Sequence, residues 1–274
     1  MKIKFLGTAA YEGMPALFCE CGACKRAIVS GGRNIRTRTQ ALIDDQLLID
    51  FPPDTLYHSQ KYALDWTKIH SCLITHSHSD HLYIEDIPQM KEWCSHGESK
   101  LHFYSAEDGY NKIMSVLNYT NWQKRVAITK IKAGDVFNAD GYNVLALPAN
   151  HDADASPVFF AVEKNGKRIL YAHDTGVFPT EAWKLLEHFG EFDLVSLDCT
   201  GGIGKFGEWR DGHLTLNTAL EILAHMRSVG LANLNTLVVL NHFSHNCDSI
   251  YDELLPIEKE KGVIISFDGM ELEI

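Results

Sequence analysis

Three imidazoles and one carboxylate fall within six positions of the chain, in residues 76–81, which read H-S-H-S-D-H. Imidazole nitrogens and carboxylate oxygens are common ligands of zinc and manganese. His76 and His78 alternate along the chain, so an extended backbone sends both side chains to the same side. Asp80 and His81 follow a turn and point elsewhere, which suits a second metal ion nearby. A histidine-rich surface loop without a ligand is the alternative, but such tracts seldom carry an acid at this spacing.

The elements around this run explain how it is positioned. The apolar residues 71–74 predict a buried strand directly before it, and residues 82–94 predict a helix after it. Three further histidine- or aspartate-bearing segments, 150–152, 173–176 and 241–243, each follow an apolar stretch that we interpret as a strand. Because a rigid sheet presents side chains to a cleft at its strand ends, we expect these segments to complete a metal site.

A second group of metal-ligand residues lies near the N-terminus. Cys19, Cys21 and Cys24 form a C-x-C-x-x-C pattern, and three thiolates this close can bind one tetrahedral zinc ion. The fourth ligand must then come from elsewhere in the chain. Three free cysteines in a loop are the alternative. The chain has 7 cysteines, an odd number that favours a metal site in a reducing compartment over a disulfide framework.

Length and composition fit an ordinary globular protein. The 274 residues are 45% hydrophobic and 22% charged, enough for one large α/β domain or two small ones. No apolar run is long enough to span a bilayer, and residues 1–7 predict a strand rather than a signal peptide, so we expect a cytoplasmic protein. The formal net charge of -11 argues against a nucleic-acid partner.

Hydrophobic periodicity and turn residues predict the remaining elements. We expect strands over 2–7, 41–43, 47–50, 101–104, 126–131, 142–147, 157–163, 168–172, 194–197, 236–240 and 263–267, and helices ending near residue 62 and over 106–117, 179–189, 214–229 and 249–261. Residues 201–212 predict a glycine-rich loop, and residues 270–274 a short tail. The early strands cluster and the later ones alternate with helices, which favours an α/β sandwich of mixed sheets covered by helices.

At residues 76–81 the chain resembles the metallo-β-lactamase superfamily, whose signature is an H-x-H-x-D-H run after a strand. The resemblance implies a four-layer αβ/βα sandwich, here a single domain over 1–274, with one or two metal ions between its halves. It also implies the ligands: His76, His78 and His151 for one metal ion, Asp80, His81 and His242 for the other, and Asp174 as the bridging carboxylate. His173 should face the opposite way. Zinc and manganese both suit this ligand set.

A closer resemblance is to the PhnP family of phosphoribosyl cyclic phosphodiesterases. It is carried by residues 19–24, 211–218, 241–245 and 267–271, with patchy agreement between them. It implies that Cys19, Cys21, Cys24 and His245 hold a structural zinc ion, and it suggests a homodimer. The loop 201–210 departs from that family, so the reaction type carries over better than the substrate.

These features predict a metal-dependent hydrolase that cleaves a small cyclic or nucleotide-type phosphodiester with a hydroxide bridging two metal ions. We assign catalytic roles to Asp80 and to His213, the latter as general acid for the leaving group. His213 could instead cap a helix or lie on the surface. Lys205 and Arg210 could meet a second phosphate or simply be solvated.

Two other functions remain open. A hydrolase of the same fold acting on a lactone, thioester or β-lactam would use the same site, and a non-catalytic carrier or assembly protein would keep the fold without the chemistry. A tRNA-processing nuclease is disfavoured by the excess of 36 acidic over 25 basic residues.

Overall fold

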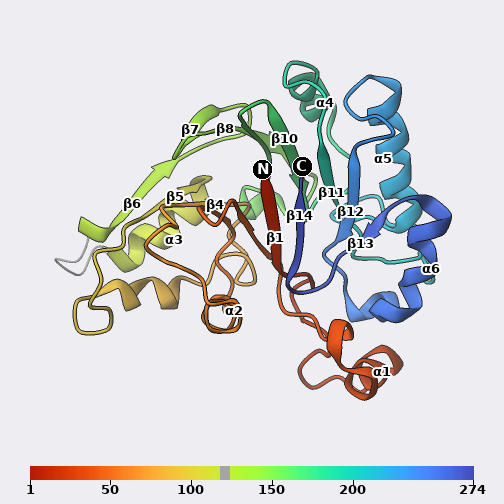
Figure 1. Cartoon of the computed structure of the whole chain (residues 1–274), viewed down its shortest axis with the longest axis horizontal. Coiled ribbons are helices and arrows are strands. Elements are labelled where there is room, and N and C mark those ends of the chain that lie inside the picture. Colours follow the sequence, from red (N-terminus) through yellow and green to blue (C-terminus); the bar gives the residue numbers. More distant parts are fainter. Residues whose placement is uncertain (118–123) are drawn as a thin grey trace.

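The computed structural model describes residues 1–117 and 124–274, which form two seven-stranded mixed sheets (Figure 1). The first sheet has the order β14 (Met270–Glu273), β1 (Lys2–Gly7), β2 (Gln40–Ile43), β3 (Leu47–Ile49), β4 (Ser71–Ile74), β5 (Leu101–Ser105) and β6 (Val126–Lys130). The second has the order β13 (Ile264–Ile265), β12 (Leu237–Asn241), β11 (Leu194–Asp198), β10 (Lys167–Ala172), β9 (Val158–Lys164), β8 (Tyr142–Pro148) and β7 (Val136–Ala139).

Helices cover the outer face of each sheet, which confirms the predicted four-layer sandwich (Figure 1). The first sheet packs against α2 (Thr55–Tyr62) and α3 (Glu107–Leu117), and the second against α4 (Thr180–Glu187), α5 (Leu216–Ser228) and α6 (Tyr251–Lys261). Helix α1 (Gly22–Ser30) projects away from both layers (Figure 1). Short 3-10 turns are η1 (Gly32–Asn34), η2 (Ile84–Met90), η4 (Ala153–Ala155) and η5 (His245–Cys247).

Alternation along β9 shows how one strand joins two cores. Phe160 packs into the core between the sheets, whereas its neighbour Phe159 packs into the core between the second sheet and its helices. Both side chains are fully buried. Because successive strand residues face opposite sides, a strand buried on both faces reads as a continuous apolar run. Each such phenylalanine contributes roughly 1.5–3 kcal/mol from burial.

Several predictions of elements need correction. The helix expected over 82–94 is wrong: the chain forms only the 3-10 turn η2 there, and Pro88 within it lacks the amide hydrogen that an α-helix needs. The tail expected after residue 269 is instead strand β14, which pairs antiparallel with β1. Strand β13 is shorter than expected. Helix α1 and strand β7 were not predicted.

The strand directions bring the expected ligand segments to one edge. Strands β3 to β6 run parallel in the first sheet, and β10 to β13 run parallel in the second. Carboxyl ends of parallel strands lie together, and ligands of open α/β sheets bind there. None of the helices in the described part of the chain has the length and apolar character that crossing a lipid bilayer requires.

Candidate metal centre

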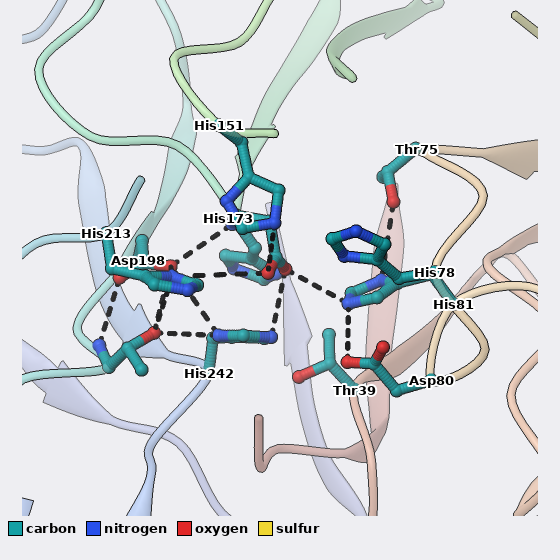
Figure 2. A network of polar contacts seen from close by, with 12 residues as sticks. Thr39, Thr75, His78, Asp80, His81, His151, His173, Asp198, His213 and His242 are labelled. Carbon is teal, nitrogen blue, oxygen red and sulfur yellow. Dashed lines mark hydrogen bonds and ion pairs between the residues drawn. The ribbon is translucent and has the colours of Figure 1, made fainter. Parts of the chain in front are cut away.

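All seven residues expected to bind the active-site metals come together at the ends of four strands. The loop after β4 carries His76, His78, Asp80 and His81, while His151, Asp174 and His242 follow β8, β10 and β12. Ligand atoms lie within 4.8 Å of one another in several groups, among them His76 with His78 and His151, His76 with His81 and Asp174, and Asp80 with His81 and His242. The rings of His81, His151 and His242 point into a shared space in Figure 2.

Asp174 lies between the two sets of histidines. Its Oδ2 is 2.9 Å from Nε2 of His242 and 3.1 Å from Nε2 of His81. Its Oδ1 is 3.8 Å from Nε2 of His151. One carboxylate oxygen therefore faces each set, which is the arrangement that a carboxylate bridging two cations requires.

The buried polar atoms of this centre test whether it fits a metal. Four buried atoms of the centre make no hydrogen bond: Nε2 of His81, of His151 and of His242, and Oδ2 of Asp174. Oδ2 of Asp174 lies close to two of these nitrogens, but without hydrogen-bond geometry. Leaving a buried polar atom unpaired costs roughly 1–3 kcal/mol, and native proteins seldom tolerate several together. These lone pairs converge on common points instead of forming donor–acceptor pairs. The residues present thus fit divalent cations.

The electrostatics of the centre also favour a bound cation. Burial alone would raise the pKa of Asp174, but His242 and His81 outweigh it and hold that pKa well below its usual range. Burial also opposes charge on His81, but the adjacent carboxylates, foremost Asp174, hold its pKa well above the ordinary value. Burial lowers the pKa of His76 well below the ordinary value, so this ring offers a lone pair. The carboxylates leave negative charge that a cation here would neutralise.

An outer layer of hydrogen bonds fixes the orientation of each imidazole. Nδ1 of His81 lies 2.7 Å from Oδ2 of Asp50, and Nδ1 of His242 lies 2.8 Å from the hydroxyl of Thr200. Nδ1 of His151 lies 3.2 Å from the Gly212 carbonyl oxygen. These three rings therefore direct Nε2 toward the centre. His78 has the opposite orientation: its Nε2 lies 3.1 Å from Oδ2 of Asp152, and its Nδ1 faces His76.

Two buried aspartates of this layer, Asp50 and Asp198, were missed in the sequence. Asp50 also accepts hydrogen bonds from the amide and hydroxyl groups of Thr75, directly before the histidine run. Asp198 accepts one from the backbone amide of Asp174 at 3.1 Å. Each aspartate stands at the end of an apolar strand stretch, as Asp174 does, a signal that makes both candidates but does not show which side chains they contact.

His213 lies at the rim of the same centre, close to His242 and His151 (Figure 2). Its Nδ1 is 3.0 Å from Oδ2 of Asp198, so Nε2 is the atom left for a substrate. Burial opposes charge on the ring, but Asp198 outweighs it and raises the pKa of His213 to about 9. His173 faces away from the centre, as expected, with Nε2 2.8 Å from the hydroxyl of Ser196.

A close approach of two loops positions His213. The amide of Val177 donates to the carbonyl oxygen of Arg210 at 2.8 Å. A Cβ at Gly176 would lie 2.1 Å from that same oxygen, so a side chain there would push the loops apart. The backbones of Asp174 (φ 50°) and His242 (φ 64°) are left-handed, a strain that surrounding structure often holds at functional sites.

The cysteine cluster forms a separate centre at the N-terminal end of α1, where Cys21 is the N-cap and Cys24 lies in the first turn. Sγ, Nδ1 or Nε2 atoms of Cys19, Cys21, Cys24 and His245 lie within 4.8 Å of one another. Nδ1 of His245 is 3.5 Å from Sγ of both Cys19 and Cys21, and the amide of Cys24 donates to Sγ of Cys21 at 3.4 Å. Three sulfurs and one imidazole at such distances suit a tetrahedral zinc ion.

A pocket of about 490 Å³ opens over the first centre. Its described lining consists of Ala10, Tyr11, Glu12, His78, Ser79, Asp80, His151, Asp174, Thr200, Trp209, His213, His242, Ser244 and Asn246. The two cations considered for a second phosphate point elsewhere. Arg210 pairs with Glu221 at 2.6 Å, and Lys205 pairs with Asp248.

The chain is similar in sequence to known proteins. A family model described as "Beta-lactamase superfamily domain" matches residues 46–243. Coenzyme PQQ synthesis protein B of Acinetobacter baumannii (strain ACICU) is 23% identical, with 100% of each chain covered.

Two solved structures have a similar fold over the whole chain. A diphosphatase from the PhnP family superposes with a TM-score of 0.73 at 19% identity, covering 100% of this chain and 97% of that one. Zinc-bound PqqB from Methylobacterium extorquens also has a TM-score of 0.73, at 18% identity, with 100% of both chains covered. At these identities the likeness establishes the fold.

Proposed function

Because the chain belongs to the beta-lactamase superfamily, we propose that it is a binuclear metal-dependent hydrolase that cleaves small phosphodiesters. The observation that carries this proposal is the position of Asp174, with one carboxylate oxygen toward His151 and the other toward His81 and His242. A bridged pair of cations is the arrangement used in many enzymes of phosphate-ester hydrolysis.

The ligand set proposed from the sequence fits this arrangement. His76, His78 and His151 would hold one metal ion, Asp80, His81 and His242 the other, and Asp174 would contact both. When bound, such ions make water nucleophilic near neutral pH and neutralise charge on phosphoryl oxygens.

The chain's own contribution to the reaction is orientation and proton transfer. Asp50 and Asp198 hold the imidazoles of the centre in place through buried contacts. His213, fixed at Nδ1, would give the proton at Nε2 to the departing alkoxide oxygen. The pocket gives a diester access to the metal centre and to His213. The Cys19, Cys21, Cys24 and His245 cluster would hold a structural zinc ion outside the pocket.

The experiment is hydrolysis of bis(p-nitrophenyl) phosphate by protein loaded with zinc or manganese. We expect turnover that is lost in His78→Ala and kept in the matched variant His70→Ala, because His70 is exposed and lies outside the centre. Metal-loaded protein that cleaves no phosphodiester would refute the proposal.

Two alternatives are separated by the same experiment. Full-length likeness to Coenzyme PQQ synthesis protein B favours a role in assembly of a small molecule, and the same centre could attack a carbonyl carbon. A lactone or thioester cleaved faster than every diester would favour the carbonyl reaction. Metal binding without any turnover would favour the assembly role.

A further inference from the structure

Glu12 is the one carboxylate of the described pocket lining that belongs to neither set of expected metal ligands. It lies in the loop after β1, and its side chain is 31% exposed. The amide of Asn246 donates to its Oε1 at 3.0 Å, and the hydroxyl of Ser244 approaches its Oε2 at 3.4 Å. Both partners follow His242 closely in the chain, so Glu12 is held at a defined place beside the metal centre.

The charge of the pocket makes this position informative. Among the described residues that line it there is neither lysine nor arginine, and residues 118–123 contain neither type. Three cations around the pocket are already paired. Arg38, whose Nε donates to the Tyr11 carbonyl oxygen at 2.8 Å, pairs with Asp54 at 3.1 Å. Arg210 pairs with Glu221, and Lys205 with Asp248. A substrate phosphate outside the metal centre would therefore meet a carboxylate and no free cation, and like charges brought together oppose binding.

The rest of the lining suits a planar, uncharged group. Trp209 lies beside His213, with ring centroids 6.5 Å apart, and Tyr11 is 60% exposed at the same pocket. Aromatic faces stack on nucleobases irrespective of sequence. Glu12 offers acceptors to hydroxyl or amino groups, which are the polar groups of a nucleoside.

We propose that Glu12 is a specificity-determining residue that selects diesters with a single phosphate, of the nucleoside cyclic phosphate type, and excludes those with a second phosphate. The inference rests on the proposed phosphodiesterase function and deepens it. It differs from what the resemblance to phosphoribosyl cyclic phosphodiesterases alone implies, because such a substrate carries a further phosphate on its ribose.

Glu12 also lies near a ligand of the proposed structural zinc, so the test must distinguish a supporting role there from substrate selection. Nε2 of His245 lies 3.9 Å from its Oε1, on the side of the ring opposite the cysteines. A carboxylate behind a zinc-binding histidine often supports the metal site. A purely supporting role would lower zinc content or stability and would change turnover of all substrates alike.

The test compares adenosine 2′,3′-cyclic phosphate with the same molecule carrying a 5′-phosphate, a pair that differs by one phosphate. For the metal-loaded wild type we expect kcat/KM to be at least about tenfold higher for the substrate without the 5′-phosphate. This ratio should fall as the NaCl concentration rises, because salt screens the repulsion between Glu12 and the 5′-phosphate. Glu12→Gln keeps the shape of the side chain and should narrow the ratio, and Glu12→Lys should narrow it further or invert it. Glu187→Gln, an exposed change on α4 with the same effect on net charge, should leave it unchanged.

The outcomes separate the two proposals. If bis(p-nitrophenyl) phosphate is cleaved but the ratio is the same in wild type and Glu12→Gln, the specificity role is overturned and the phosphodiesterase function stands. A wild type that prefers the 5′-phosphorylated substrate also overturns it. Zinc content and thermal unfolding are measured for every variant. Glu12→Asp retains the negative charge and should preserve the wild-type preference. It keeps the test informative if Glu12→Lys does not fold.

Discussion

Nδ1 of His81 lies 2.7 Å from Oδ2 of Asp50, and both side chains are almost completely buried. This contact joins the end of β3 to the loop after β4 and leaves Nε2 of His81 facing Asp174. A carboxylate behind a histidine ligand raises its basicity and fixes its orientation. The contact therefore predicts how one variant outside the ligand set changes metal binding.

Asp50→Asn should weaken metal binding without removing a ligand. We expect the affinity for the metal held by His81 to fall about 10–100-fold, the range seen when such outer contacts are lost. Competition with a chromogenic chelator measures it. Asp65→Asn, an exposed residue outside the ligand set, is the control. Equal affinity in both variants would show that Asp50 does not support the metal.

His213→Gln should affect substrates according to their leaving group. p-Nitrophenolate departs without a proton, whereas the ribose alkoxide of a cyclic nucleotide needs one, so general acid catalysis matters only for the second. We expect a loss of kcat about 10²-fold or more for adenosine 2′,3′-cyclic phosphate, within the usual range for such catalysis, and a much smaller loss for bis(p-nitrophenyl) phosphate. Metal content should not change. Equal losses for both substrates would remove His213 as the acid.

Cys21→Ser should remove one metal ion per chain and leave the active-site pair in place. Sγ of Cys21 accepts from the amide of Cys24 and lies near His245, so it is central to the second centre. Because metal binding contributes directly to folding stability, the melting temperature should also fall. Elemental analysis is the measurement, and Cys94→Ser, exposed on the surface, is the control. An unchanged zinc content would rule out the structural site.

His58 should make folding stability depend on pH. Its ring lies between the amide oxygen of Gln40 at 2.6 Å and the hydroxyl of Thr37 at 2.7 Å, and burial lowers its pKa to about 3. The unfolded histidine takes up a proton near its ordinary pKa of about 6.5, so below that pH the unfolded state binds more protons. The contribution of neutral His58 to the free energy of unfolding is therefore fully present above about pH 6.5. It is lost as the pH falls toward 3, by at most about 1.4 kcal/mol per pH unit.

Urea unfolding of metal-saturated protein at pH 7.5 and pH 5.5 tests this dependence. His58→Gln should reduce the difference in free energy of unfolding between the two pH values. The exposed variant His70→Gln should not. A wild-type difference that persists in His58→Gln would assign the acid sensitivity to other groups.

Local chemistry made much of this protein predictable from its sequence. The histidine run, the strands and the hairpins depend on residue type and short spacing. The sandwich could therefore be predicted, and so could the seven residues that the fold brings together at the strand ends. The helix expected after His81 failed because Pro88 removes a backbone hydrogen bond, and the strand β14 was missed because its pairing with β1 joins the two ends of the chain.

What only the tertiary structure decided is which groups meet across long separations. Asp50 and Asp198 look in the sequence like any acid after an apolar run, and their contacts with His81 and His213 exist only because parallel strands share one edge. Glu12 likewise meets Asn246 only in the folded chain, where the loop after β1 approaches the segment after β12. Sequence spacing determines local ligand geometry, whereas the charge and shape of a pocket depend on contacts between residues that are distant in the chain.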